Sequence, residues 1–184
     1  MSYRKAIPFA ALALLLPGCE KNQRPLPNSA VTTNRTRSTN PPTLYLDHAL
    51  PKLPTLKLWI GAKEMEAELA LDHTQIATGM MYRKEMGENA GMLFVFGRPV
   101  QVAFYMRNTI IPLSAAYIDT EGVILEIHDL KPLDETPIEA SSDKVQFVLE
   151  TPQGWFKRNN IDVGALIRSE YGSLQEVFSR RREP

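Results

Sequence analysis

The sequence has a single cysteine, Cys19, among its 184 residues, so no disulfide can form within one chain. Its three histidines, His48, His73 and His128, match no metal-binding spacing. A phosphate-binding loop, a dinucleotide-binding fingerprint and the nucleophile elbow of serine hydrolases are also absent. Lys+Arg and Asp+Glu both number 21, so there is no net charge to attract nucleic acid. We therefore expect no cofactor and no nucleic-acid partner.

Long hydrophobic runs are absent too, and the longest one lies near the N-terminus. Arg4 and Lys5 precede an apolar run from Ala6 to Leu16. A membrane-spanning helix needs about 20 apolar residues, so this run is too short to span. A basic start followed by a short apolar run is typical of an export signal, which we place at residues 1–18.

The apolar run ends in Leu16-Pro17-Gly18-Cys19. This segment resembles the bacterial lipobox, although Pro17 replaces the usual small residue. The resemblance implies that the Cys19 thiol receives diacylglycerol, that cleavage follows Gly18, and that the new amino group is acylated, for example with palmitate. We therefore expect an exported envelope lipoprotein, held on the outer membrane or on the periplasmic face of the inner membrane. The alternative is an ordinary cleaved signal with an incidental cysteine.

Residues 19–54 are expected to form the lipidated cysteine and a disordered tether. Seven of the 14 prolines lie between Pro17 and Pro54, and the stretch is rich in Asn, Thr and Ser with no hydrophobic period. Such a chain buries too little apolar surface to offset the entropy of ordering it. We place one globular domain at residues 55–168 and a C-terminal tail of mixed charge at residues 169–184.

Alternating hydrophobicity predicts strands through most of the domain. A hairpin with Gly61-Ala62 at its turn is followed by strands at residues 92–96, 100–106, 113–119, 123–130, 144–150 and 165–168. Short helices are predicted at residues 75–81 and directly after Thr151-Pro152. This pattern predicts a mainly β fold with short helices, of the α+β class, built on a small barrel-like antiparallel sheet.

Four sequence blocks occur in a specific order. They are Gly79 to Arg83, Gly91 to Phe96, Phe104 to Leu113, and Val148 to Phe156. Together they resemble the bacterial and archaeal family called domain of unknown function 192. The resemblance covers residues 55–168 and implies a small β-rich barrel with no established reaction. In the third block Tyr105 stands where the family usually has tryptophan, and Arg107 where it usually has lysine.

The third block also holds the densest group of polar side chains. Arg107 offers a planar donor fork for a carboxylate or phosphate, and a nearby Arg83 would add a second one. The predicted ligand-binding residues are Arg83, Tyr105, Arg107, Asn108 and Thr109. In the alternative interpretation, which we favour, Asn108 and Thr109 only cap a turn.

Methionine is concentrated between residues 80 and 106. Thioethers are soft ligands that select Cu(I), so a copper site is one interpretation. Its candidate ligands are Met80, Met81, Met92, Met106 and His73. Core packing, in which methionine fills irregular gaps, is the interpretation that the apolar surroundings favour.

Acid–base chemistry has few candidates. Asp72-His73 is one, although Asp72 fits the cap of the predicted helix better. Glu150 is interpreted as a rim residue at a strand end. The leading hypothesis is a binding or accessory module that takes a small anionic molecule, glycan or envelope protein on the face with Arg107. The alternatives are a small hydrolase with a site near His73, Arg83 and Arg107, and a purely structural accessory protein.

Overall fold

The structure is a computed structural model in which residues 44–179 are described. The predicted export signal, Cys19 and the tether up to residue 43 lie outside the described residues. The described part of the chain forms ten strands and three short helices. The strands are β1 (Thr55–Ile60), β2 (Lys63–Ala70), β3 (Ala90–Val100), β4 (Ala103–Phe104), β5 (Leu113–Ile118), β6 (Ile124–Leu130), β7 (Ile138–Glu139), β8 (Val145–Pro152), β9 (Ile167–Ser169) and β10 (Gly172–Ser173). The helices are α1 (His73–Thr78), α2 (Trp155–Arg158) and α3 (Leu174–Ser179).

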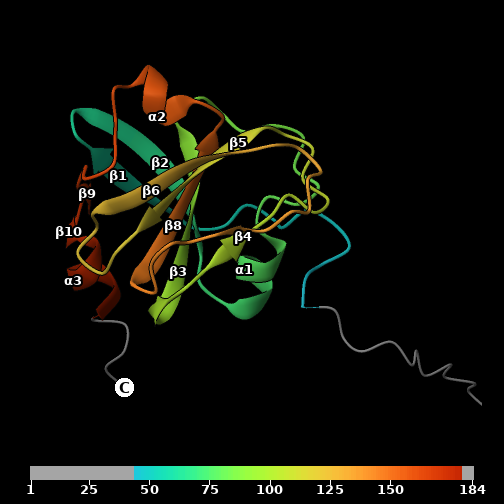
Figure 1. The fold of residues 1–184 in the computed structure, drawn as a ribbon, viewed down its shortest axis with the longest axis horizontal. Coiled ribbons are helices and arrows are strands. Elements are labelled where there is room, and N and C mark those ends of the chain that lie inside the picture. The colour runs from blue at the N-terminus through green and yellow to red at the C-terminus, as the bar shows by residue number, and fades with distance from the viewer. Residues whose placement is uncertain (1–43, 180–184) are drawn as a thin grey trace, which may run out of the picture. The chain divides into compact units, whose positions relative to one another are not determined.

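Eight of these strands form one sheet in the order β10-β9-β1-β2-β3-β8-β5-β6 (Figure 1). Its neighbouring strands are antiparallel except β2 and β3, which run parallel. Strands β4 and β7 form a separate two-stranded ribbon. The mainly β fold with short helices is therefore confirmed, and no helix within residues 44–179 is long and apolar enough to cross a membrane.

The predicted barrel needs correction, because the sheet is not closed. The residues that precede β6 and β9 meet at an isolated bridge between Val123 and Leu166, and no ladder extends from this bridge in the described chain. Closure of a sheet depends on strand tilt and stagger. Alternating hydrophobicity predicts that strands exist, but it carries no information about these two quantities.

The β1–β2 hairpin follows directly from the sequence pattern. Leu58 of β1 pairs with Met65 of β2, and both are buried, whereas Glu64 and Glu66 are exposed. Gly61 has φ 59° at the turn, a conformation that glycine adopts at no steric cost. One buried and one exposed face produce the alternation from which the hairpin was predicted.

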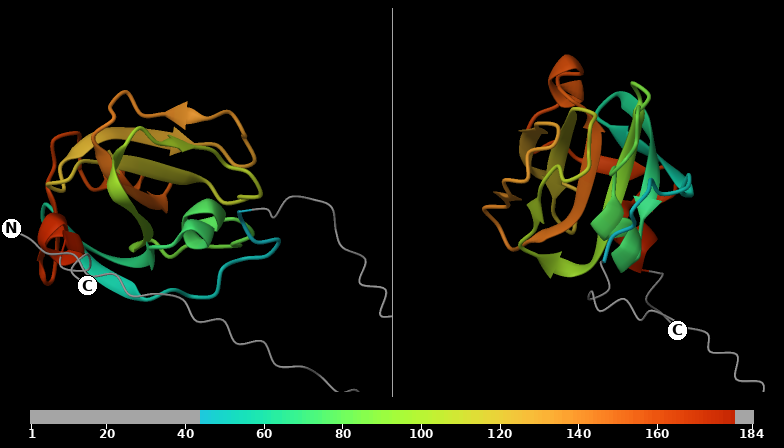
Figure 2. Two further views of the ribbon diagram at one scale, coloured as in Figure 1. Left: turned by 90° about the horizontal axis from the view of Figure 1, so that it is seen from below. Right: turned by 90° about the vertical axis from the view of Figure 1, so that its right-hand side faces the viewer.

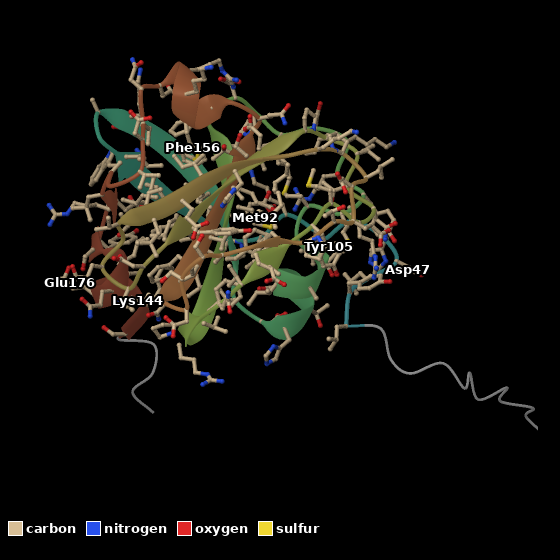
Figure 3. The ribbon with its side chains drawn as sticks, viewed as in Figure 1. Asp47, Met92, Tyr105, Lys144, Phe156 and Glu176 are labelled. Atoms are coloured by element: carbon tan, nitrogen blue, oxygen red, sulfur yellow. The ribbon has the colours of Figure 1, made fainter. Side chains whose placement is uncertain are left out.

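Central strand β8 is buried on both faces. Its Phe147 and Leu149 point into one hydrophobic cluster, which includes residues of α2 and α3. Its Val148 points into a second cluster on the opposite face, as the two-residue period of a strand requires. Met92 lies in this second cluster and in the interior of the domain (Figure 3).

Residues 44–54 of the predicted tether pack against the domain beside α1 (Figure 2). Leu50 and Leu53 are buried, and the Leu46 N–H donates a hydrogen bond to Thr78 Oγ1 at 3.0 Å. The described part of the predicted tail is packed as well, because Phe178 of α3 is buried. Isolated leucines among prolines have no period, so the sequence does not reveal these contacts.

Candidate functional site

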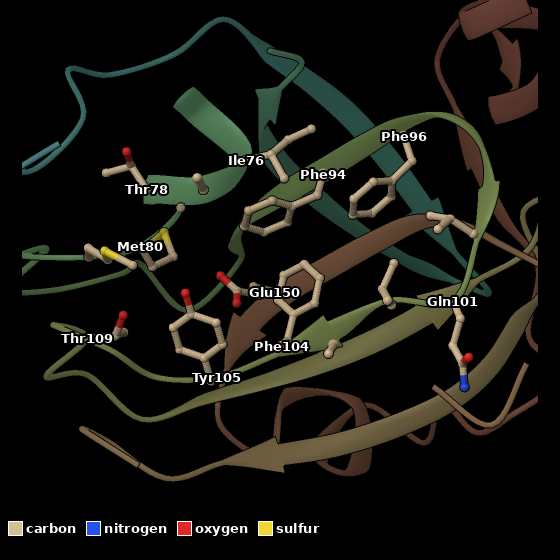
Figure 4. A pocket seen from close by; sticks show the side chains of 16 residues that line it. Ile76, Thr78, Met80, Phe94, Phe96, Gln101, Phe104, Tyr105, Thr109 and Glu150 are labelled. Carbon is tan, nitrogen blue, oxygen red and sulfur yellow. The ribbon is translucent and has the colours of Figure 1, made fainter. Parts of the chain in front are cut away.

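A cavity of about 360 Å³ opens between α1, β3 and the β4–β7 ribbon (Figure 4). Most of its wall is apolar. The side chains of the wall come from α1, the loop after α1, β3 and the third sequence block. The aromatic and methionine residues that line it are Met80, Met81, Phe94, Phe96, Phe104 and Tyr105. An open, mainly apolar cavity of this size fits the range of small-molecule sites, about 300–1,000 Å³.

Helix α1 forms one wall of the cavity. The residues at its two ends, Asp72 and Gly79, determine where it begins and ends. Asp72 accepts a hydrogen bond from the Gln75 N–H at 2.8 Å, and the Gln75 side chain accepts from the Asp72 N–H in return. This capping box satisfies free N–H groups at the start of the helix. At the other end Gly79 has φ 46°, and a Cβ there would lie 3.1 Å from the Phe94 ring. Position 79 therefore requires glycine, because a side chain there would crowd the Phe94 ring and because other residues rarely adopt this positive φ.

The β4–β7 ribbon holds the opposite wall. Phe104 of β4 meets Phe94 edge to face with ring centroids 5.1 Å apart, a favourable aromatic geometry. Phe104 pairs with Ile138 of β7, and the Ile138 carbonyl accepts a hydrogen bond from the Tyr117 hydroxyl at 2.6 Å. Because Tyr117 belongs to β5, this bond ties the ribbon to the sheet.

The acidic group of the cavity wall is the carboxyl group of Glu150. Glu150 lies on β8, paired with Met92 of β3 and Ala115 of β5, and Figure 4 shows its carboxyl group near Met80 and Phe104. The residue is 5% exposed, and its Oε2 atom has no hydrogen-bond partner among residues 44–179. Burial raises the pKa of Glu150 to about 8, because an apolar environment disfavours the charged form.

The interpretation of Glu150 as a rim residue is therefore wrong. The sequence predicts a helix directly after Thr151-Pro152, but β8 continues through Pro152 and α2 begins after Gly154. Glu150 consequently lies within a strand that is buried on both faces. The two-residue period could have revealed it, since Glu150 shares a face with the apolar Val148.

Among the described residues, none that lines the cavity is an arginine, lysine or histidine. Two of the predicted ligand-binding residues, Tyr105 and Thr109, do line it. Tyr105 is 38% exposed, and Thr109 is buried with its hydroxyl donating to the Arg107 carbonyl at 3.1 Å. The cavity therefore combines one acidic group with neutral surroundings.

Arg83 and Arg107 do not enter this cavity. Arg83 donates two hydrogen bonds to Glu68, at 3.0 and 2.8 Å, and lines a second groove. Arg107 donates to Glu135 at 2.9 and 2.7 Å and lies over the Tyr105 ring, 5.3 Å from its centroid. The two guanidinium groups are thus each paired with a carboxylate and do not converge on one cleft.

Asn108 occupies a turn, as the favoured interpretation requires. It has φ 52°, a left-handed conformation that asparagine tolerates. Its side-chain amide donates to the Tyr82 hydroxyl at 2.8 Å, and the Tyr82 N–H donates to the Asn108 carbonyl at 2.8 Å. These contacts join the first and third sequence blocks.

Most of the candidate copper ligands are core residues. Met80, Met92 and Met106 are buried in one hydrophobic cluster, and Met80 and Met81 also line the cavity. His73 is exposed at the start of α1. Within residues 44–179, no group of three His, Cys, Asp or Glu residues could hold a metal ion.

The model of the family DUF192, described as "Uncharacterized ACR", matches residues 57–169. The chain belongs to this family. No curated protein matches the sequence. The cavity and Glu150 lie within the range that the DUF192 model covers.

Two solved structures are similar to this DUF192 domain. One is the crystal structure of a protein from Sinorhizobium meliloti 1021, described as a candidate transcription regulator. It has 30% identity over 66% of this chain and 98% of that chain, with a TM-score of 0.62. The other comes from Novosphingobium aromaticivorans DSM 12444 and is described as a protein of unknown function. It has 29% identity over 66% of this chain and 89% of that chain, with a TM-score of 0.61.

Proposed function

We propose that this protein is a binding module of the cell envelope that holds a small, largely apolar molecule in the cavity above Glu150. The observation that carries the proposal is the Oε2 atom of Glu150, which is buried in the wall of an open apolar cavity and finds no partner in the described part of the chain. A buried carboxyl group without a hydrogen bond costs folding free energy. Such local costs are typical of functional sites, where a ligand supplies the missing partner.

The size and the walls of the cavity agree with this role. Its volume of about 360 Å³ is at the low end of small-molecule sites, so the ligand is compact. Aromatic and methionine side chains offer apolar contact that adapts to the shape of a ligand. A glycan would need several polar partners, and the cavity wall provides few.

The envelope location is proposed from the sequence alone. The lipobox-like segment at Cys19 and the proline-rich stretch after it support a lipid anchor with a tether. In this arrangement the tether holds the domain and its cavity close to a membrane.

A hydrolase is the second candidate, because a carboxyl group with a raised pKa is suited to general acid–base catalysis. A hydrolytic site of this kind also needs a nucleophile or an activated water molecule. The Thr109 hydroxyl, which lines the cavity, donates to a backbone carbonyl, and no histidine among the described lining residues could activate it. Binding is therefore the better-supported function.

Ligand-observed NMR with a library of small aromatic and aliphatic fragments tests the proposal. The full chain is reconstituted in nanodiscs, and empty nanodiscs provide the background. Phe96 lines the cavity and is half-buried, so Phe96→Ala should weaken fragment binding about 5- to 30-fold through lost apolar contact. Trp59→Ala is the matched control, because Trp59 is partly exposed on β1 and lies outside the cavity. No fragment binding, or equal binding in both variants, would overturn the proposal.

A further inference from the structure

We propose that the ligand of this cavity carries a protonated amine, which docks on the Glu150 carboxylate while the apolar body of the ligand contacts the aromatic wall. This inference rests on the binding function proposed above and specifies the chemical class of the ligand.

The charged groups of the cavity favour a cation. Glu150 is acidic, and the described lining residues include no arginine, lysine or histidine. An anionic ligand would therefore enter an apolar space without a counter-charge, which is strongly unfavourable. A cationic ligand would find its counter-charge in Glu150, at the same position.

The missing hydrogen bond favours a donor. Glu150 Oε2 is buried and accepts no hydrogen bond from the residues that the structure describes, and an ionised carboxylate can only accept hydrogen bonds. An ammonium group has three N–H donors and no acceptor. Charge-assisted bonds between such groups are short and about twice as strong as neutral ones, so an amine is a better donor to Oε2 than a neutral hydroxyl group is.

The rings around Glu150 favour the same ligand. Phe94 and Phe104 line the cavity in edge-to-face contact, and Phe96 and Tyr105 extend the aromatic wall. The face of an aromatic ring attracts a cation, most strongly where water is excluded. The same rings also provide the apolar surface for the body of the ligand.

Few other titratable groups surround Glu150. Its strand neighbours, Met92 and Ala115, do not titrate. Tyr105 lines the cavity, and Tyr117 of β5 has a pKa raised by burial and, to a smaller extent, by the charges of Glu126 and Glu150. Near neutral pH, Glu150 is therefore the group that we expect to release a proton when an amine binds.

This proton makes the affinity for an amine depend on pH. Because burial raises the pKa of Glu150 to about 8 in the free protein, the group is mostly protonated at pH 6 and must release its proton to pair with an ammonium group. The affinity should then rise about 50-fold between pH 6 and pH 8. An alcohol of the same shape releases no proton, so its affinity should stay nearly constant.

Two sets of small probes with matched carbon frames test the inference. The first set is 2-phenylethylamine, 2-phenylethanol and 3-phenylpropanoate, and the second is hexylamine, hexanol and hexanoate. Each is titrated by calorimetry into the full chain in phosphatidylcholine nanodiscs, with empty nanodiscs subtracted. At pH 8 we expect the amine of at least one set to bind at least tenfold more tightly than its alcohol, and the acid to bind most weakly. Titrations in buffers of different ionisation enthalpy should show about one proton released per amine below pH 8.

Glu150→Gln keeps the size of the side chain and removes its charge. It should lower the affinity for the amine at least tenfold at pH 8 and leave the affinity for the alcohol nearly unchanged. The pH dependence of the unaltered protein gives a second result that needs no variant. An amine that binds no more tightly than its alcohol in both sets, or an affinity independent of pH, overturns the inference. The fragment screen then still decides the proposed binding function, because that screen does not depend on the charge of the ligand.

Discussion

Arg83 donates two hydrogen bonds to Glu68, at 3.0 and 2.8 Å, and the two side chains are only 19% and 16% exposed. Glu68 also accepts a hydrogen bond from the Leu53 N–H at 2.8 Å. The ion pair therefore joins β2, the loop after α1 and the segment that precedes β1. Its position indicates a role in holding the fold together.

Arg83→Ala should lower the free energy of unfolding by about 2–3 kcal/mol, because it leaves a mostly buried carboxylate without its cation. Urea unfolding followed by circular dichroism measures this change. Lys84→Ala, at the exposed neighbouring position, is the control and should change the stability by less than about 0.5 kcal/mol. Loss of fragment binding in Arg83→Ala without loss of stability would show that Arg83 belongs to a ligand site.

Arg107→Ala separates the hypothesis made from the sequence from the proposal made from the cavity. Arg107 pairs with Glu135 at the surface, with 38% and 55% of the two side chains exposed, and it does not line the cavity. Exposed ion pairs contribute little to stability, so the midpoint of urea unfolding should hardly move. The affinity of fragments for the cavity should also be unchanged in calorimetric titrations. A selective loss of affinity for anionic fragments would instead favour a site on the face with Arg107.

Glu150 should make the stability of the protein fall as the pH rises. Its pKa is raised from 4.5 to about 8 in the folded chain, so between these two values the folded state binds more protons than the unfolded state. The stabilisation present below pH 4.5 is then lost as the pH rises through 8. Relative to Glu150→Gln, the unaltered protein should lose roughly 3–5 kcal/mol between pH 4.5 and pH 9. Urea unfolding of both proteins across this range measures the difference, and parallel pH profiles would contradict it.

The strands were predictable where one face of the sheet meets water. Leu58 and Met65 are buried while Glu64 and Glu66 are exposed, and this contrast appears in the sequence as alternation. Strand β8 was misplaced at its end because Thr151-Pro152 is typical of a helix start. Packing on both faces of β8 prevailed over this local signal.

The candidate site was predictable only in part, because it depends on contacts between distant segments. Tyr105 and Thr109 were selected for their polar groups and do line the cavity. Glu150 was missed, since its environment is set by α1 and β4, which are about 50 to 75 residues away in the chain. Arg83 was selected as a free cation, but its partner Glu68 lies on a strand whose acidic residues mostly face water. Sequence pattern identifies ionisable groups, whereas the fold decides which of them are already paired.

Cys19 is the proposed site of the membrane anchor. Since this is the only cysteine in the sequence, a thiol-reactive maleimide reports on it without interference from other residues. In cells that export the chain, we expect the purified protein to be unreactive toward maleimide after denaturation and to incorporate labelled palmitate. Cleavage with trypsin should yield a lipidated N-terminal peptide, Cys19-Glu20-Lys21, in mass spectrometry. Acyl chains contribute about 0.8 kcal/mol per buried methylene, so this modification alone accounts for stable membrane attachment.

In Cys19→Ala the label should be absent and the precursor, with residues 1–18 attached, should accumulate. A mature chain whose Cys19 reacts with maleimide would mean that the signal is an ordinary cleaved one and that the cysteine is incidental.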